Sequence, residues 1–196
     1  MPRPFFKGVF VVREDFDKCL AFVFMNEGGD SNHKFDRGGR TRYGITEGTL
    51  NRAYRQKIVK HCDVGKLSRA EAADIYKAFY WIPSCCDYLP YPFCCIHFDA
   101  AVNSGVGGAA KLLQRTLNRF CKAGLKVDGA VGPMTRAAMK AVFNALDYPQ
   151  VSAEVCGIYC DARGELYEKI IKRNPSQEVF RRGWFARLDR CRRLCA

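Results

Sequence analysis

The sequence predicts a mainly α protein with one short non-helical insert. Apolar residues recur with the period of a helix through most of the 196-residue chain, which gives about eight helices. Helix-start signals stand in front of several of these segments. Only the polar, glycine-rich stretch 30–43 lacks the period, and it predicts an irregular segment or a short β-hairpin.

The first helix carries apolar residues at Phe16, Cys19, Leu20 and Val23, which is the spacing of one buried face. We expect it to end at Gly28-Gly29. The hairpin of the following insert is expected around Gly38-Gly39.

Two further helices have recognisable starts. Thr46 is a candidate N-cap for the second helix. Ser68 with Glu71 forms a capping box for the third helix. The proline-bearing stretch Pro83–Cys95 is predicted to be a loop.

The second half continues the helical pattern. Pro133 stands at the expected first position of a helix, after turn signals at 128–132. Two long helices are predicted at the end, one ending near Arg173 and one starting at Asn174-Pro175. The glycines at 105–108 form the strongest break in composition.

We therefore place a soft domain boundary at these glycines. The sequence predicts one region at 10–105 and a helical lobe at 106–192, closely packed on the first. No internal repeat or low-complexity linker separates them.

Charge indicates the kind of partner. Thirty-two Lys and Arg against twenty Asp and Glu give a net charge of +12, so attraction to a polyanion is expected. Nucleic acid and anionic polymers of the bacterial envelope both qualify. The sequence has no helix-turn-helix, zinc-knuckle or single-strand-binding signature, so we expect no specific nucleic-acid partner.

Cysteine usage and the N-terminus bear on location. Eleven Cys is an odd number, which favours reduced thiols over a disulfide framework. No cleavable signal peptide and no apolar run long enough to cross a bilayer are recognisable. We expect synthesis in the cytoplasm and no stable membrane insertion.

One group of four cysteines is a candidate for a metal site. Cys156 with Cys160 and Cys191 with Cys195 are each at i, i+4, so the four thiols are able to face one another on two helices. The spacing differs from the tight knuckles of structural zinc sites, and the three His residues are scattered. We favour buried thiols and expect no metal or other cofactor.

Glu27 is the candidate acid. It stands at the end of an apolar helix and before two glycines that allow close approach of a substrate. Hydrolysis of a glycosidic bond needs a carboxylic acid that protonates the leaving oxygen, and apolar surroundings raise its pKa for that task. Asp30 and Asp36 are candidates for the second carboxylate. Taken alone, such a Glu is more often an ordinary surface residue.

Ordered motifs along the chain change this balance, because together they resemble glycoside hydrolase family 108. Those in the first half are Glu27-Gly28-Gly29, Asp36-Arg37-Gly38-Gly39, Thr41, Tyr43-Gly44-Ile45-Thr46, Tyr80-Trp81 and Phe98-Asp99-Ala100-Ala101-Val102-Asn103-Ser104-Gly105. The second half resembles a peptidoglycan-binding module in Leu112-Leu113-Gln114-Arg115, Val127-Asp128-Gly129, Val131-Gly132-Pro133 with Thr135, Asn174-Pro175-Ser176-Gln177, Phe180, Gly183-Trp184 and Arg187.

The resemblance implies a lysozyme-like helical fold, and cleavage of the bond between N-acetylmuramic acid and N-acetylglucosamine. It makes Glu27 the catalytic acid. Phage muramidases more broadly pair this Glu with an Asp about nine positions on, which falls on Asp36, and with a Thr further on. Both Thr41 and Thr46 meet that description.

Other residues are candidates for binding the substrate. Asp30 joins this group as well as being a possible second carboxylate. Tyr43, Tyr80 and Trp81 offer surfaces for sugar rings, although core packing explains Tyr80 and Trp81 equally well. Asn103 is a candidate for a hydrogen bond to an acetamido group, or for a cap at the glycine break.

Several functional readings remain open. The favoured one is a phage or prophage endolysin that needs a holin or another export route to reach the wall. A lytic transglycosylase and a noncatalytic wall-binding or secretion-associated protein of the same fold are the alternatives. The second half is either a wall-binding module or a second lobe of the fold, and we favour a lobe with some affinity for the wall.

Overall fold

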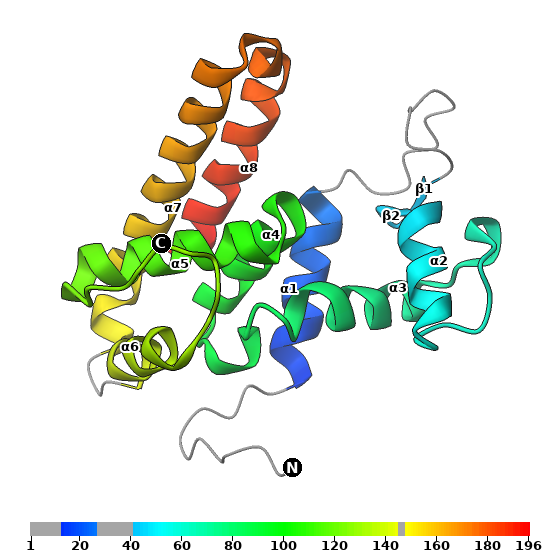
Figure 1. Cartoon of the computed structure of the whole chain (residues 1–196), viewed down its shortest axis with the longest axis horizontal. Helices are drawn as coiled ribbons and strands as arrows, with labels where there is room; N and C mark the ends of the chain where they lie inside the picture. Colours follow the sequence, from blue (N-terminus) through cyan, green and yellow to red (C-terminus); the bar gives the residue numbers. More distant parts are fainter. Residues whose placement is uncertain (1–12, 27–40, 145–147) are drawn as a thin grey trace.

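The computed structural model describes residues 13–26, 41–144 and 148–196, and these residues are mainly helical (Figure 1). Eight α-helices lie in the described part of the chain: α1 (Arg13–Asn26), α2 (Glu47–Arg55), α3 (Arg69–Tyr76), α4 (Phe93–Ser104), α5 (Val106–Cys121), α6 (Pro133–Phe143), α7 (Tyr148–Arg173) and α8 (Arg181–Leu194). Shorter turns are η1 (Val64–Lys66), η3 (Cys86–Tyr88) and η4 (Pro175–Phe180), with 3-10 geometry, and the π-helical η2 (Lys77–Trp81). The predicted fold class is confirmed.

The β structure is a two-stranded antiparallel hairpin. Strand β1 (Thr41–Arg42) pairs with β2 (Ile45–Thr46), and Tyr43 and Gly44 form the turn between them. Both turn residues have positive φ, 53° and 73°, which suits a tight two-residue hairpin. The predicted turn at Gly38-Gly39 lies outside the described residues.

Helix α4 is the centre of the molecule. Every residue from Phe93 to Ala101 is buried, because α1 and α5 pack directly on this helix and α7 also reaches it. Trp81 packs edge-on between Phe16 and Phe98, with ring centroids 5.2 and 5.3 Å apart. A helix that is apolar on all sides is typical of a buried core position.

Helices α7 and α8 form an antiparallel pair that extends from the body, while α2 and the hairpin lie at the opposite end (Figure 1). None of the described helices combines the length and apolarity that crossing a bilayer requires.

The predicted helix starts agree with the structure where local signals are strong. The Thr46 side chain caps α2, and Ser68 with Glu71 forms the full capping box of α3. Pro133 opens α6, and α7 ends at Arg173.

Three boundaries differ from the prediction. The loop predicted for Pro83–Cys95 contains η3 and gives way to α4 at Phe93. The helical break spans only Gly105, because Gly108 lies inside α5, where a Cβ would come within 3.1 Å of the Ser104 Cβ. The last α-helix starts at Arg181, since the 3-10 turn η4, capped by Asn174, comes first.

Candidate functional site

The predicted catalytic segment leaves the described fold at the end of α1 and returns at strand β1. Glu27, Asp30 and Asp36 lie outside the described residues. Asn26, which directly precedes Glu27, and Thr41 mark the two ends of this segment. The surroundings of these two ends define the candidate site.

Asn26 is fixed by both ends of its amide. Its Nδ2 donates to Asp99 Oδ1 at 2.9 Å, which ties α1 to α4. Arg190 Nε of α8 donates to Asn26 Oδ1. The residue before the predicted acid is therefore held by helices from both halves of the chain.

Asp99 is the centre of a buried ion cluster that ties α4 to α7 and α8. Its carboxylate is 0% exposed and accepts hydrogen bonds from Arg163 Nη1 at 2.7 Å and from Arg187 Nε at 3.0 Å. Burial alone would raise the pKa of Asp99, but the two guanidinium groups more than offset burial and lower it. The carboxylate therefore stays ionised inside the protein.

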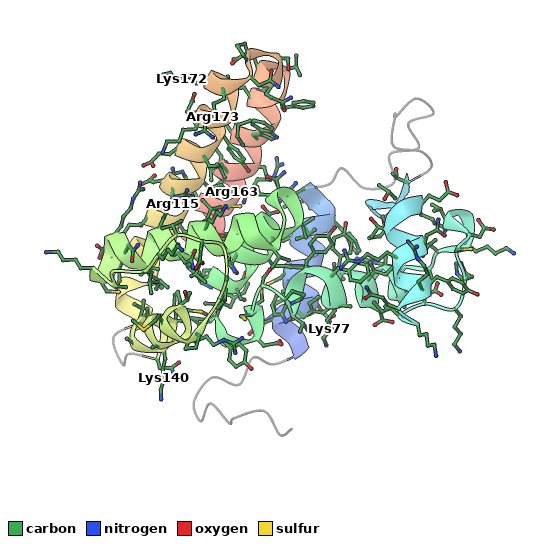
Figure 2. All side chains as sticks on the ribbon, in the orientation of Figure 1. Lys77, Arg115, Lys140, Arg163, Lys172 and Arg173 are labelled. Carbon is green, nitrogen blue, oxygen red and sulfur yellow. The ribbon has the colours of Figure 1, made fainter. Side chains whose placement is uncertain are left out.

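Asn103 lies one helical turn beyond Asp99, at the exposed end of α4. Its side-chain carbonyl accepts from the Tyr167 hydroxyl at 2.9 Å and from Arg163 Nη2 at 3.3 Å. Arg163 lies at the junction of α7, α8 and α4, whereas Lys172 and Arg173 lie at the far end of α7 (Figure 2). Asn103, the predicted binding residue, is thus exposed, and two side chains of α7 hold its carbonyl oxygen.

Tyr43 lies in the hairpin turn and contacts α1 through Phe24. Its carbonyl oxygen accepts from the Tyr76 hydroxyl at 3.1 Å, and this bond supports a left-handed backbone that is unusual for a tyrosine. Its half-buried ring packs on Phe24 with centroids 6.1 Å apart, and the Arg42 guanidinium lies 5.4 Å from the ring centroid. One part of the ring remains accessible beside α1.

The two candidate threonines are direct cross-strand partners in the hairpin. Side chains of directly opposed residues point to the same face of a sheet, so the Thr41 and Thr46 side chains share one face of the hairpin. The Thr46 hydroxyl accepts from the Thr49 amide at 3.2 Å as the cap of α2. Thr41 is exposed, and its hydroxyl makes no hydrogen bond within the described residues.

Tyr80 and Trp81 differ in exposure, although they are adjacent in sequence. Trp81 is 0% exposed, and its indole N–H donates to Asp87 Oδ1 at 2.6 Å. Its ring is closed off by the core, which corrects its prediction as a sugar-binding surface and supports the packing alternative. Tyr80 is half-buried against Tyr76, with ring centroids 5.7 Å apart.

A cavity of about 350 Å³ lies between α1 and α3. Its lining residues are Asp17, Leu20, Ala21, Arg69, Ala70 and Ala73. None of them is a predicted catalytic or binding residue, although the Arg69 guanidinium lies 5.4 Å from the ring centroid of Phe24, which packs on Tyr43.

The segment 127–133 is a turn between α5 and α6, as the sequence predicts. Buried Gln114 organises it. Its side-chain carbonyl accepts from the Gly129 amide at 3.0 Å, and its Nε2 donates to Asp128 Oδ1 at 2.9 Å. Gly129 has φ +87°, and a Cβ there would lie 2.9 Å from the Gly107 carbonyl oxygen. The glycine is needed for this close approach.

The cysteines are free thiols, most of them buried. Cys19 and Cys94 Sγ atoms lie 3.7 Å apart between α1 and α4. Cys156 lies near Cys195, and Cys160 lies near Cys195 and Cys191, so the four cysteines are close neighbours on α7 and at the end of α8. Among the described residues, no three His, Cys, Asp or Glu side chains are arranged to hold a metal ion.

Sequence reasoning missed the roles of the ion cluster and of Asn26. One signal was available, because Asp99 is a charged residue in a mainly apolar helix and therefore requires a buried cation as partner. Nothing in the sequence identified Arg163, Arg187 and Arg190 as the arginines involved, since basic residues are numerous and spread along the chain.

Comparisons with known proteins agree with the geometry. Residues 20–105 match the family described as glycosyl hydrolase 108, and residues 108–189 match the predicted peptidoglycan domain. A comparison with curated proteins found no match.

Among solved structures, the chain is similar to SagA of Brucella abortus. The sequences are 32% identical, the TM-score is 0.67, and the match covers 92% of this chain and 93% of SagA. The helical fold with its small hairpin is lysozyme-like. The matched families describe a glycoside hydrolase that acts on peptidoglycan. Taken together, the ordered motifs, the fold and these matches establish that the chain belongs to the glycosyl hydrolase 108 family and carries a predicted peptidoglycan domain in its second half.

Proposed function

We propose that the protein is an N-acetylmuramidase that cleaves the bond between N-acetylmuramic acid and N-acetylglucosamine, with Glu27 as the general acid. The observation that carries this proposal is the double clamp on Asn26, by Asp99 of α4 and Arg190 of α8. This clamp fixes the last described residue before Glu27. A fixed starting point is what a general acid needs to meet a glycosidic oxygen.

In this proposal the carboxyl group of Glu27 protonates the oxygen of the leaving sugar. Asp36 then orients a water molecule or stabilises the positive charge that develops on the sugar ring. Asp30 contributes to substrate binding near the same segment. The stereochemical course follows from the anomer of the released sugar, which NMR of fresh product reads directly.

Thr41 is the better candidate for the assisting hydroxyl. Thr46 already uses its oxygen as the cap of α2, whereas Thr41 is exposed on the same face of the hairpin. A hydroxyl that makes no hydrogen bond with the described residues is available to water or substrate.

Substrate contacts are proposed for Tyr43, Tyr80 and Asn103, which retain accessible surface. Tyrosine rings supply flat apolar faces for sugars, and the Asn103 amide supplies polar contacts. Trp81 is left out of this set because its ring is fully buried.

We further propose a phage or prophage endolysin, made in the cytoplasm and acting on the wall after passage through a holin or another export route. A net charge of +12 supports attraction to anionic envelope polymers around the peptidoglycan. That attraction acts before the specific contacts form.

The test compares wild type with Glu27→Gln on purified peptidoglycan, with released fragments identified by mass spectrometry. Wild type is expected to release reducing ends of N-acetylmuramic acid, and Glu27→Gln at least 100-fold less, on the order expected for loss of a general acid. Glu154→Gln is the matched control, because Glu154 is exposed on α7 and is expected to keep full activity.

Other products would overturn the proposal. Anhydro-muramyl ends identify a lytic transglycosylase, which uses one acid and no attacking water. Reducing ends of N-acetylglucosamine identify a different bond. Binding to the wall without any cleavage identifies a noncatalytic protein of this fold.

A further inference from the structure

Asn103 has an unusual environment for an exposed residue. Two donors from a different helix hold its side-chain carbonyl: the Tyr167 hydroxyl at 2.9 Å and Arg163 Nη2 at 3.3 Å. Both donors come from α7, 60 and 64 positions away in sequence but adjacent in space. An exposed asparagine normally samples several rotamers, so such anchoring restricts it.

The protons in this arrangement have one consistent order. Arg163 Nε donates to the Tyr167 oxygen at 2.7 Å, and a guanidinium group is never an acceptor. The Tyr167 hydroxyl therefore accepts from Arg163 and directs its own proton to Asn103 Oδ1. It follows that the carbonyl of Asn103 faces α7, and its amide N–H groups face away from it.

The two anchoring side chains are themselves rigid. Arg163 is 1% exposed and is held by the buried carboxylate of Asp99 at 2.7 Å. Tyr167 is 1% exposed, and its ring stacks on Trp184 with centroids 5.0 Å apart and planes at 23°. The orientation of the Asn103 amide is thus set by buried groups, which is how a binding group is preorganised.

We propose that Tyr167 and Arg163 are positioning residues for Asn103, which presents its amide N–H to the carbonyl oxygen of an N-acetyl group on the glycan. This inference rests on the proposed function, because it names the sugar group that the same site binds. It gives the predicted peptidoglycan domain a part in forming the substrate site, since α7 belongs to that domain.

Chemistry favours an acetamido oxygen as the partner. The Asn103 amide offers donors only, so its partner must be an acceptor. Each sugar of the peptidoglycan strand carries an N-acetyl group, whose carbonyl oxygen is a strong acceptor. A site that holds a hydrogen-bond donor in place loses the most binding affinity when the ligand lacks the matching acceptor.

The key variant is Tyr167→Phe, which removes one hydroxyl and keeps the stacked ring. Its matched control is Tyr159→Phe. Tyr159 also lies on α7, is fully buried, and has a hydroxyl bonded to α4, at 2.9 Å from His97 Nδ1. Both changes remove one buried hydroxyl between the same two helices, so both are expected to lower stability similarly.

Binding is measured by titration calorimetry with peptide-free glycan strands, in the full chain carrying Glu27→Gln so that no strand is cut. Tyr167→Phe and Asn103→Ala are each expected to weaken Kd about 10-fold, the effect of one well-placed hydrogen bond. The double variant is expected to lose no more than either single one, because both act through the same amide. Tyr159→Phe is expected to bind like the parent.

De-N-acetylated strands provide a readout that lost stability does not change. The parent is expected to bind N-acetylated strands more tightly than de-N-acetylated strands, measured at one pH and ionic strength. Tyr167→Phe, which leaves the charge of the protein unchanged, is expected to reduce this preference about 10-fold. Tyr159→Phe is expected to keep it.

The inference is overturned if Tyr167→Phe keeps the parent's preference, if Asn103→Ala binds normally, or if Tyr159→Phe weakens binding equally. Asn103 is exposed, so Asn103→Ala still tests the proposal if Tyr167→Phe does not fold. Failure of the proposed function is visible separately. If the wild-type chain cuts no glycosidic bond while the binding pattern holds, the muramidase proposal is overturned. The role of Tyr167 and Arg163 in positioning Asn103 is then still supported.

Discussion

Asp99 illustrates how one residue links the stability of the fold to the candidate site. It is a carboxylate in the interior, which is costly unless cations and hydrogen bonds satisfy it. Arg163 and Arg187 supply the cations, and Asn26 supplies an amide donor at 2.9 Å. The same group therefore holds the core together and holds the end of α1.

Asp99→Asn is expected to lower the free energy of unfolding by about 3–5 kcal/mol, because two arginines lose their buried counter-charge. Urea denaturation measures the change. Asp161→Asn is the control, since Asp161 pairs with Arg192 on the surface, at 60% exposure, and is expected to cost less than about 1 kcal/mol. Equal losses in the two variants would contradict the role assigned to the buried cluster.

The two threonines of the hairpin are separable by a pair of variants. Thr46→Ala removes the cap of α2 and is expected to cost about 1 kcal/mol of stability. Thr41→Ala is expected to leave stability within about 0.5 kcal/mol and to reduce the rate of peptidoglycan cleavage. Thermal unfolding and product release measure the two effects. Full activity in Thr41→Ala would remove Thr41 from the mechanism.

At the scale of elements, α4 decides most of the architecture. Its buried faces meet α1 and α5, and its polar residues are satisfied by long-range partners. His97 is one of them, since its ring nitrogens bond to the Tyr159 hydroxyl of α7 at 2.9 Å and the Ser84 carbonyl at 3.1 Å. A fully buried imidazole of this kind connects three parts of the chain.

This histidine predicts an acid-sensitive fold. Burial lowers the pKa of His97 from 6.5 to about 4, so the folded state keeps it neutral while the unfolded chain takes up a proton. The contribution of neutral His97 to the free energy of unfolding is therefore fully present above pH 6.5. It falls by about 1.4 kcal/mol per pH unit from pH 6.5 toward pH 4. Urea denaturation across this range measures the slope. His97→Gln is expected to be less stable at neutral pH, with a flatter slope; an unchanged slope would exclude His97 as its source.

At the scale of the whole molecule, the two halves form one interior. Asp99 of the hydrolase region bonds to arginines of α7 and α8, and Asn26 bonds to Arg190 of α8. The division at residues 10–105 and 106–192 stays a prediction about the chain, but the buried cluster ties the two regions together. The glycosyl hydrolase 108 region and the predicted peptidoglycan domain therefore share a scaffold.

Residues 1–105 expressed alone are expected not to fold cooperatively, because Asp99 and the buried faces of α4 lose their partners on α5, α7 and α8. Circular dichroism during thermal unfolding measures this. Co-expression with residues 106–196 is the control and is expected to restore a cooperative transition. A cooperative transition of residues 1–105 alone would show that the first region is independent.

The sequence by itself determined the helical class, the main helix starts and the family. Thr46, the Ser68–Glu71 pair and Pro133 act on backbone groups within a few residues of themselves, so local sequence contains the whole signal. The ordered motifs identified the family in the same way. They also singled out Asn103 as a candidate for binding.

Only the tertiary structure decided which candidate side chains are exposed and which face the core. Trp81 has neighbours in α1 and α4 that no local pattern reveals, and it is closed off by them. Asn26 meets Asp99 across 73 positions of sequence and Arg190 across 164. Such pairs form because packed helices bring distant groups together, and buried charges must then be matched. The orientation of the Asn103 amide follows from that packing.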